Sequence, residues 1–180
     1  IAQSNDQPEE VIFTTLLESC WPSHRYGRPI LGKKENLIRM IPTEMKSFHK
    51  RQYLGKNCTL SIAGEVPEDV TSIINNSDLN SLRTDSNKND SSVKPIFQKG
   101  YKKQLIPRLE SGRILKAWEL VPAKEQLLIL GADIATTILS EGRTSHMVRR
   151  LREEQQIVES IEMDLHILER GGLVLLEVCC

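Results

Sequence analysis

The stretch that decides the fold lies in the last quarter of the chain. It reads Ile157-Val158-Glu159-Ser160-Ile161-Glu162-Met163-Asp164-Leu165, followed by Gly171-Gly172 and the apolar run 173–180. The apolar residues of its first part alternate with mostly polar ones, which is the period-two pattern of a strand with one buried face. Gly171-Gly172 supplies a turn, and the run that follows reads as a second strand. The stretch therefore predicts two adjacent antiparallel strands.

One strand and two helices are predicted before this pair. Residues 113–121 read as a strand, and Pro122 then starts a helix with two apolar stripes, one of Leu127, Leu130, Ile134 and Ile138 and one of Leu128, Ala132, Ala135 and Leu139. A helix that is apolar on most sides is expected to be buried. Glu141-Gly142 breaks it, and a second helix over residues 144–155 pairs Arg149 with Glu153 and Arg150 with Glu154 at a spacing of four.

The order of strand, helix, helix, strand, strand predicts an α+β fold, a mostly antiparallel sheet covered by helices. The first half of the chain reads differently, with a helix from Pro8 that ends at Trp21-Pro22 and a helix from Pro42 with Thr43 as its N-cap. A strand is expected over residues 58–64 because Cys58, Leu60 and Ile62 alternate with smaller residues, and a further helix is expected from Pro67.

A change in composition divides the chain. From residue 75 to residue 89 the sequence is dominated by Asn, Ser, Asp and Lys, and it stays polar to residue 103. A connection of this length is uncommon inside one compact domain. We therefore expect two partial domains, residues 1–74 and 104–180, joined by a polar linker over residues 75–103.

Composition excludes some function classes. The 24 basic and 24 acidic residues give a net charge of zero, and only 4% of residues are aromatic, which argues against a nucleic-acid partner. No apolar run is long enough to span a membrane, so a soluble chain is expected, with a cytoplasmic setting favoured. The four cysteines have neither the number nor the spacing of a disulfide scaffold or a zinc site and read as reduced thiols.

Two motifs carry more information than composition. The first is the loop His24-Arg25-Tyr26-Gly27-Arg28-Pro29-Ile30-Leu31-Gly32, followed at a distance by Ser61-Ile62-Ala63-Gly64. The second is Ile138-Leu139-Ser140-Glu141-Gly142-Arg143-Thr144-Ser145-His146-Met147, followed by Leu151-Arg152-Glu153. Together, and in this order, they resemble the pitrilysin/insulinase family of zinc metallopeptidases.

The resemblance implies a zinc peptidase whose catalytic residues are not in this chain. In the family, zinc is held by a His-x-x-Glu-His helix and a later Glu, and the Glu between the histidines is the general base. The four histidines here, at positions 24, 49, 146 and 166, are isolated from one another. No metal ligand and no catalytic residue is therefore expected in the chain, and zinc is expected in a longer parent protein. The start without Met and the end within an apolar run agree with an internal fragment.

The resemblance also implies residues that hold the peptide substrate. Arg152 occupies the place of a substrate-binding Arg, and Gly142, Arg143 and Ser145 occupy a glycine-rich loop. The family's usual Gly-Leu-x-Tyr is replaced by residues 156–159, Gln-Ile-Val-Glu, so a Tyr partner for Arg152 is missing or comes from another chain. The alternatives are a solvated or salt-bridged Arg152 and a Gly142 that only stops a helix.

Three functional hypotheses follow. The first is an internal fragment, itself inactive, of an endopeptidase that hydrolyses peptides in a closed chamber. The second is a non-catalytic subunit of the same fold that holds substrate or acts as a scaffold. The third is an α+β binding domain unrelated to peptidases. Unpaired sheet edges also predict a homodimer or a paired subunit.

Overall fold

The computed structural model describes residues 2–82, 93–107 and 109–180. It divides the chain into two compact units, one made of Ile1–Gly32 together with Val93–Cys180 and the other of Lys33–Ser92. The predicted linker over residues 75–103 lies partly outside the described residues. The predicted division into residues 1–74 and 104–180 stays a prediction, since it concerns the domains of a longer protein.

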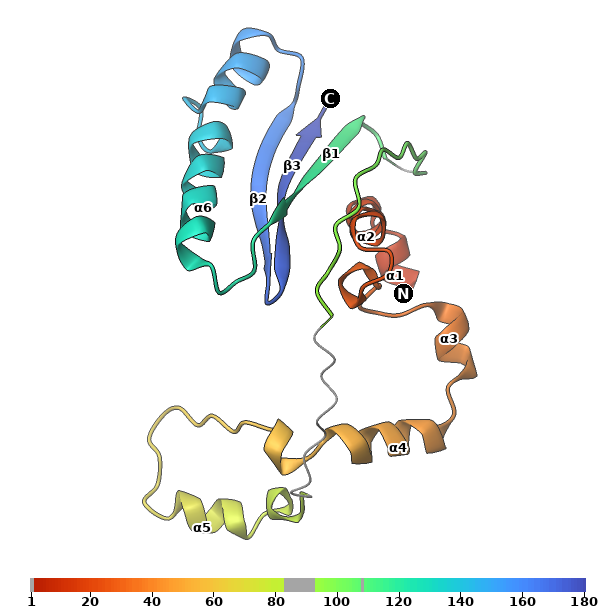
Figure 1. Ribbon diagram of the computed structural model, residues 1–180, viewed down its shortest axis with the longest axis vertical. Coiled ribbons are helices and arrows are strands. Elements are labelled where there is room, and N and C mark those ends of the chain that lie inside the picture. The colour runs from red at the N-terminus through yellow and green to blue at the C-terminus, as the bar shows by residue number, and fades with distance from the viewer. Residues whose placement is uncertain (1, 83–92, 108) are drawn as a thin grey trace. The chain divides into compact units, whose positions relative to one another are not determined.

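The first unit is built on a three-stranded antiparallel sheet (Figure 1). Its strands are β1 (Arg113–Leu120), β2 (Ser160–Leu168) and β3 (Gly171–Cys179), and β3 lies in the middle. β2 and β3 form a hairpin in which Leu168 is opposite Gly171, so residues 169 and 170 make the turn and the two glycines begin the strand. All three predicted strands are confirmed, and so is the α+β fold class.

Helices cover the two faces of this sheet (Figure 1). Helix α6 (Gln126–Ser140) and the π-helical segment η4 (Val148–Glu154) lie on one face, where Val148 packs with Ile161 and Val178. Helix α2 (Pro8–Cys20) lies on the other face. Side chains of alternate strand residues point to opposite faces, so one set of strand residues contacts α2 and the other contacts α6 and η4. The layers therefore follow from the apolar spacing.

The core on the α2 side centres on Trp21 and Leu173. Trp21 follows α2 directly, is 1% exposed, and packs with Cys20 against Leu173 of β3, which is fully buried. Helix α2 begins at Pro8 and its last turn ends with the Trp21 N–H donating to the Leu17 carbonyl at 2.9 Å. The predicted start at Pro8 and stop at Trp21-Pro22 are confirmed.

The remaining helices have from three to eleven residues. In the first unit they are α1 (Ala2–Asn5) and the 3-10 turn η1 (Arg25–Gly27). In the second unit they are α3 (Lys34–Arg39), α4 (Pro42–Gln52), η2 (Gly55–Asn57), α5 (Val70–Asn75) and η3 (Asp78–Ser81). The helices predicted from Pro42 and near Pro67 are therefore present, the latter beginning three residues late at Val70.

Two predictions in the second unit are wrong. Thr43 is not the N-cap, because α4 begins at Pro42 and its N-cap is Ile41. The N–H of Ile41 donates to Oε2 of Glu44 at 3.2 Å. Residues 58–64 form no strand in the described structure. Alternation alone does not make a strand, because its N–H and C=O groups need a partner strand, and none of the described residues pairs with this segment.

Two predictions for the helices of the first unit also need correction. Helix α6 starts at Gln126, four residues after Pro122, and it is not buried. Leu127 is 83% exposed and Ile134 and Ile138 are exposed with it, because one side of the helix meets the sheet and the other faces outward in the described part of the chain. The expected spacing of ion pairs fails as well. Arg149 pairs with Glu154 at 3.3 Å, one residue later than predicted, because η4 bonds its backbone at a spacing of five.

Replacing Leu173 by Ala tests the centre of the core. We expect the free energy of unfolding to fall by about 3 kcal/mol, because the change removes a fully buried side chain and leaves a cavity. The matched control is Leu127→Ala on the exposed side of α6, for which a change within about 0.5 kcal/mol is expected. Urea unfolding followed by circular dichroism measures both. Equal losses in the two variants would contradict this core.

Candidate functional site

The turn between α6 and η4 is set by its own hydrogen bonds. Gly142 has a φ of 78°, which lies in the left-handed region that glycine adopts without strain. The hydroxyl of Ser145 donates to the carbonyl of Gly142 at 2.8 Å, and the Ser145 N–H donates to the same oxygen at 3.2 Å. The carbonyl of Ser145 then accepts the first helical bond, from the Arg149 N–H at 2.9 Å. Gly142 and the buried Ser145 therefore shape the turn.

Two of the basic side chains at this end of the sheet lie around one carboxylate, that of Glu153. Oε1 of Glu153 lies 3.3 Å from Nη2 of Arg152 and 3.8 Å from Nε of Arg143. The side chain of Arg143 is 83% exposed and that of Arg152 is 42% exposed, so neither ion pair is shielded from water. Exposed pairs of this kind contribute about 0–1 kcal/mol each, and their main effect here is to hold two guanidinium groups near each other.

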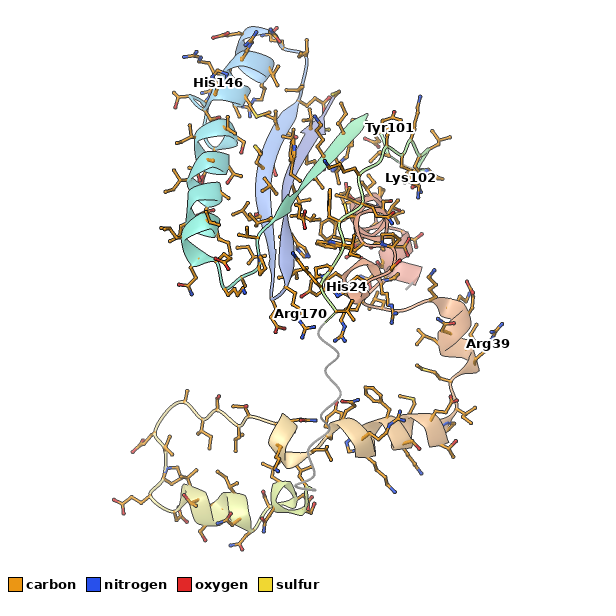
Figure 2. The ribbon with its side chains drawn as sticks, in the orientation of Figure 1. His24, Arg39, Tyr101, Lys102, His146 and Arg170 are labelled. Atoms are coloured by element: carbon orange, nitrogen blue, oxygen red, sulfur yellow. The ribbon has the colours of Figure 1, made fainter. Side chains whose placement is uncertain are left out.

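The structure thus brings together the four residues that the sequence singled out. Gly142, Arg143 and Ser145 lie in one turn, and Glu153 joins Arg143 to Arg152. Figure 2 marks the position of this turn by His146, which directly follows it at the far end of α6. Sequence reasoning paired Glu153 with Arg149 and so missed its bridging position. That these residues bind a substrate stays a prediction.

Residues of the first motif, His24 and Tyr26, connect separate segments of the first unit. His24 is buried, its Nδ1 accepts the N–H of Tyr26 at 3.2 Å, and its Nε2 lies 3.1 Å from the carbonyl of Val93. With Nδ1 as the acceptor, the tautomer that carries its proton on Nε2 lets Nε2 donate to this carbonyl. The Tyr26 hydroxyl in turn accepts the N–H of Arg170 at 3.1 Å, and Figure 2 shows Arg170 at the hairpin end near His24. His24 therefore has a packing and hydrogen-bonding role in this unit.

A second group of polar side chains lies on the sheet face that meets α2. Glu162, Asp164 and His166 alternate along β2 and share this face, because they stand opposite Glu177, Leu175 and Leu173 of β3. The His166 ring meets the ring of Phe13 edge-on at 5.4 Å between centroids. Burial lowers the pKa of His166, and the charge of Asp164 opposes this effect. His166 is therefore half-buried against α2, and the alternation along β2 is the sequence signal for this group.

The described residues contain no cluster of side chains that could bind a metal ion. No group of three or more His, Cys, Asp or Glu side chains among them could hold a metal ion. Because His24 has both ring nitrogens in hydrogen bonds to the protein, it offers no free lone pair to a metal. The residues described here therefore do not fit a zinc centre of the peptidase type, which needs three protein ligands and an open position.

A comparison with protein-family models identifies the fold. The model of the peptidase M16 inactive domain matches residues 40–180, which is more than three quarters of the chain. This chain belongs to the peptidase M16 family. The sheet, α6, the turn at Gly142 and η4 all lie inside the matched region, and the resemblance drawn from the two motifs is confirmed.

Curated relatives of this M16 chain are named as proteases. An uncharacterized zinc protease of Mycobacterium leprae is 33% identical over 69 residues, which is 38% of this chain and 16% of that protein. An uncharacterized zinc protease of Rickettsia felis is 25% identical over 156 residues, which is 86% of this chain and 37% of that protein. The alignments therefore cover less than half the length of these two relatives.

Solved structures show the same fold. A protease from Helicobacter pylori aligns with 98% of this chain and 43% of its own, with a TM-score of 0.66 and 14% identity. A peptidase M16 inactive domain from Pseudomonas fluorescens aligns with 99% of this chain and 43% of its own, with a TM-score of 0.72 and 12% identity. At these identities the likeness concerns the fold alone. Separately, none of the described helices is long and apolar enough to cross a membrane.

Replacing Gly142 by Ala tests the turn. The free energy of unfolding should fall by about 1 kcal/mol, because a Cβ is disfavoured at a φ of 78° even though no neighbouring atom lies within 4 Å of it. Gly100→Ala is the matched control, since Gly100 has equally open surroundings without a left-handed φ, and no loss is expected there. Thermal unfolding compares the two, and an unchanged Gly142→Ala variant would contradict the left-handed turn.

The pKa of His166 should lie below the value of about 6.5 for a free histidine. His166 then binds a proton more weakly in the folded chain than in the unfolded chain. The fold therefore becomes less stable as the pH falls below about 6.5. Asp164→Asn should lower this pKa further, because it removes the nearby negative charge, whereas Asp133→Asn on α6 should leave it unchanged. Proton NMR titration of the ring measures it, and a rise in Asp164→Asn would contradict the assignment.

Proposed function

We propose that this chain is the non-catalytic part of a zinc-dependent endopeptidase and that it helps to hold the peptide inside a closed chamber. The observation that carries the proposal is the match of residues 40–180 to the inactive domain of M16 peptidases. The protease names of the curated relatives support it. So does the sequence, since none of the four histidines stands in a His-x-x-Glu-His motif.

In this proposal the zinc ion is bound by residues outside the chain, and when bound it supplies an activated water for attack on a peptide carbonyl. The residues of this chain bind and orient the peptide. Arg152 is half-exposed and donor-only, so its guanidinium suits a peptide carbonyl or a terminal carboxylate. Glu153 lies within ion-pair distance of Arg152 and Arg143, so both guanidinium groups are close enough to act on one peptide.

The experiment compares the full-length protein with this 180-residue chain. We expect about one zinc ion per molecule and peptide hydrolysis in the full-length protein, and neither in the chain alone. Inductively coupled plasma mass spectrometry and a quenched fluorescent peptide measure the two properties. Neither zinc nor hydrolysis in the full-length protein would instead indicate a non-catalytic subunit that holds substrate for a partner.

The part played by Arg152 has its own variant pair within this experiment. Arg152→Ala should raise KM about tenfold with little change in kcat, because a charged hydrogen bond to the bound peptide is lost. Arg149→Ala is the matched control, since Arg149 is exposed on the same segment and is paired with Glu154. Equal effects of the two substitutions would rule out a specific role for Arg152.

A further inference from the structure

A groove lies between α2 and the sheet, on the face opposite to α6 and the Gly142 turn. We call it the α2 groove. Its volume is about 380 Å³, and its apolar floor is formed by Ile12 and Phe13 of α2 with Leu115 and Leu175 of the sheet. Since one water molecule takes about 30 Å³ of liquid volume, the groove holds the equivalent of about a dozen waters. It is therefore large enough for a long side chain.

The rim of the groove is acidic. It carries five carboxylates, Glu9 and Glu10 from α2, Glu162 and Asp164 from β2, and Glu177 from β3, with His166 beside them. The neutral form of His166 is favoured by burial, so it adds no compensating charge near neutral pH. The sheet and α2 thus direct an excess of negative charge toward one apolar cavity.

The structure already shows how one guanidinium is held next to this rim. Nη1 of Arg113 donates to Glu177 at 2.6 Å and Nη2 donates to Glu9 at 2.8 Å, so a cation bridges the sheet and α2. These two bonds satisfy Glu9 and Glu177. Glu162 and Asp164, two residues apart on the same face of β2, have no ion pair with any described residue. Oδ1 of Asp164 accepts the Leu165 N–H at 2.7 Å, and both residues are exposed to a cation from outside.

We propose that the α2 groove binds the side chain of a lysine or arginine presented by a peptide segment. The alkyl stem lies on the floor made by Phe13 and the leucines, and the charged head lies between Glu162 and Asp164. Long basic side chains bury their stems along apolar surface while the head stays at a polar rim, and the groove has this arrangement of surfaces. The Phe13 ring also attracts a cation placed over its face.

Two observations favour a basic side chain over a metal ion. The described residues contain no set of three ligands with the geometry for a metal. An apolar floor gives a bare cation nothing to bind, whereas it removes the methylene groups of Lys or Arg from water. The groove lies on the other side of the sheet from Arg152, and its occupation is measured as binding, without zinc or hydrolysis. If the proposed function is wrong, this binding measurement still decides whether the α2 groove takes a basic side chain.

The test uses the full-length protein and a fluorescein-labelled peptide, Gly-Ala-Arg-Ala-Gly, with citrulline in place of Arg as the neutral control of the same shape. We expect the arginine peptide to bind at least tenfold more tightly by fluorescence anisotropy, and this difference to shrink at high salt. Equal binding of the two peptides would overturn the proposal without any protein variant.

Protein variants locate the binding. Glu162→Gln and Asp164→Asn should each weaken binding of the arginine peptide about tenfold and leave the citrulline peptide unaffected. Asp133→Asn on α6 is the matched control and should bind like the wild type. The NMR signal of the His166 ring should shift when the arginine peptide is added. Arginine-dependent binding that survives both rim substitutions and leaves His166 unshifted would place the peptide elsewhere and overturn the proposal.

Discussion

The first unit depends on the contact between the buried side chains of Trp21 and Leu173. It joins the end of α2 to the middle strand of the sheet across about 150 residues of sequence. Two hydrogen bonds lie nearby: the Gln98 N–H donates to the Cys20 carbonyl at 2.8 Å, and the N–H of Arg170 in the β2–β3 turn donates to the Tyr26 hydroxyl at 3.1 Å. Because residues 2–32 would otherwise be short isolated helices and a loop, their order depends on this shared core.

The hairpin of β2 and β3 then distributes the chemistry over two faces. The α6 face is apolar at Ile161 and Val178, and it positions η4 and the Gly142 turn at one end of the sheet. The α2 face carries the carboxylates of β2 and His166 above an apolar floor. A one-residue shift of register would exchange these two sets, so the pairing of Leu173 with His166 decides which residues each helix meets.

Membership of the M16 family gives these features a setting. The matched region contains the turn and the Arg152 segment, and the match is to the family's inactive domain. Two guanidinium groups lie around Glu153, and the π-helical bonding of η4 sets where its charged side chains point.

The sequence by itself determined the three strands, the start and stop of α2, the α+β class and the family, because these depend on local periodicity, on Pro and Gly, and on motif residues. The sequence misplaced the features that depend on contacts between elements. Residues 58–64 alternate like a strand but have no described strand to pair with, and α6 is apolar on most sides yet meets the sheet with only one. Only the tertiary structure decided that Arg149 pairs with Glu154, that Glu153 joins two arginines, and that His166 lies beside Phe13. Spacing along a chain sets which side of an element a residue occupies, whereas distances between elements follow from packing, and packing involves residues far apart in sequence.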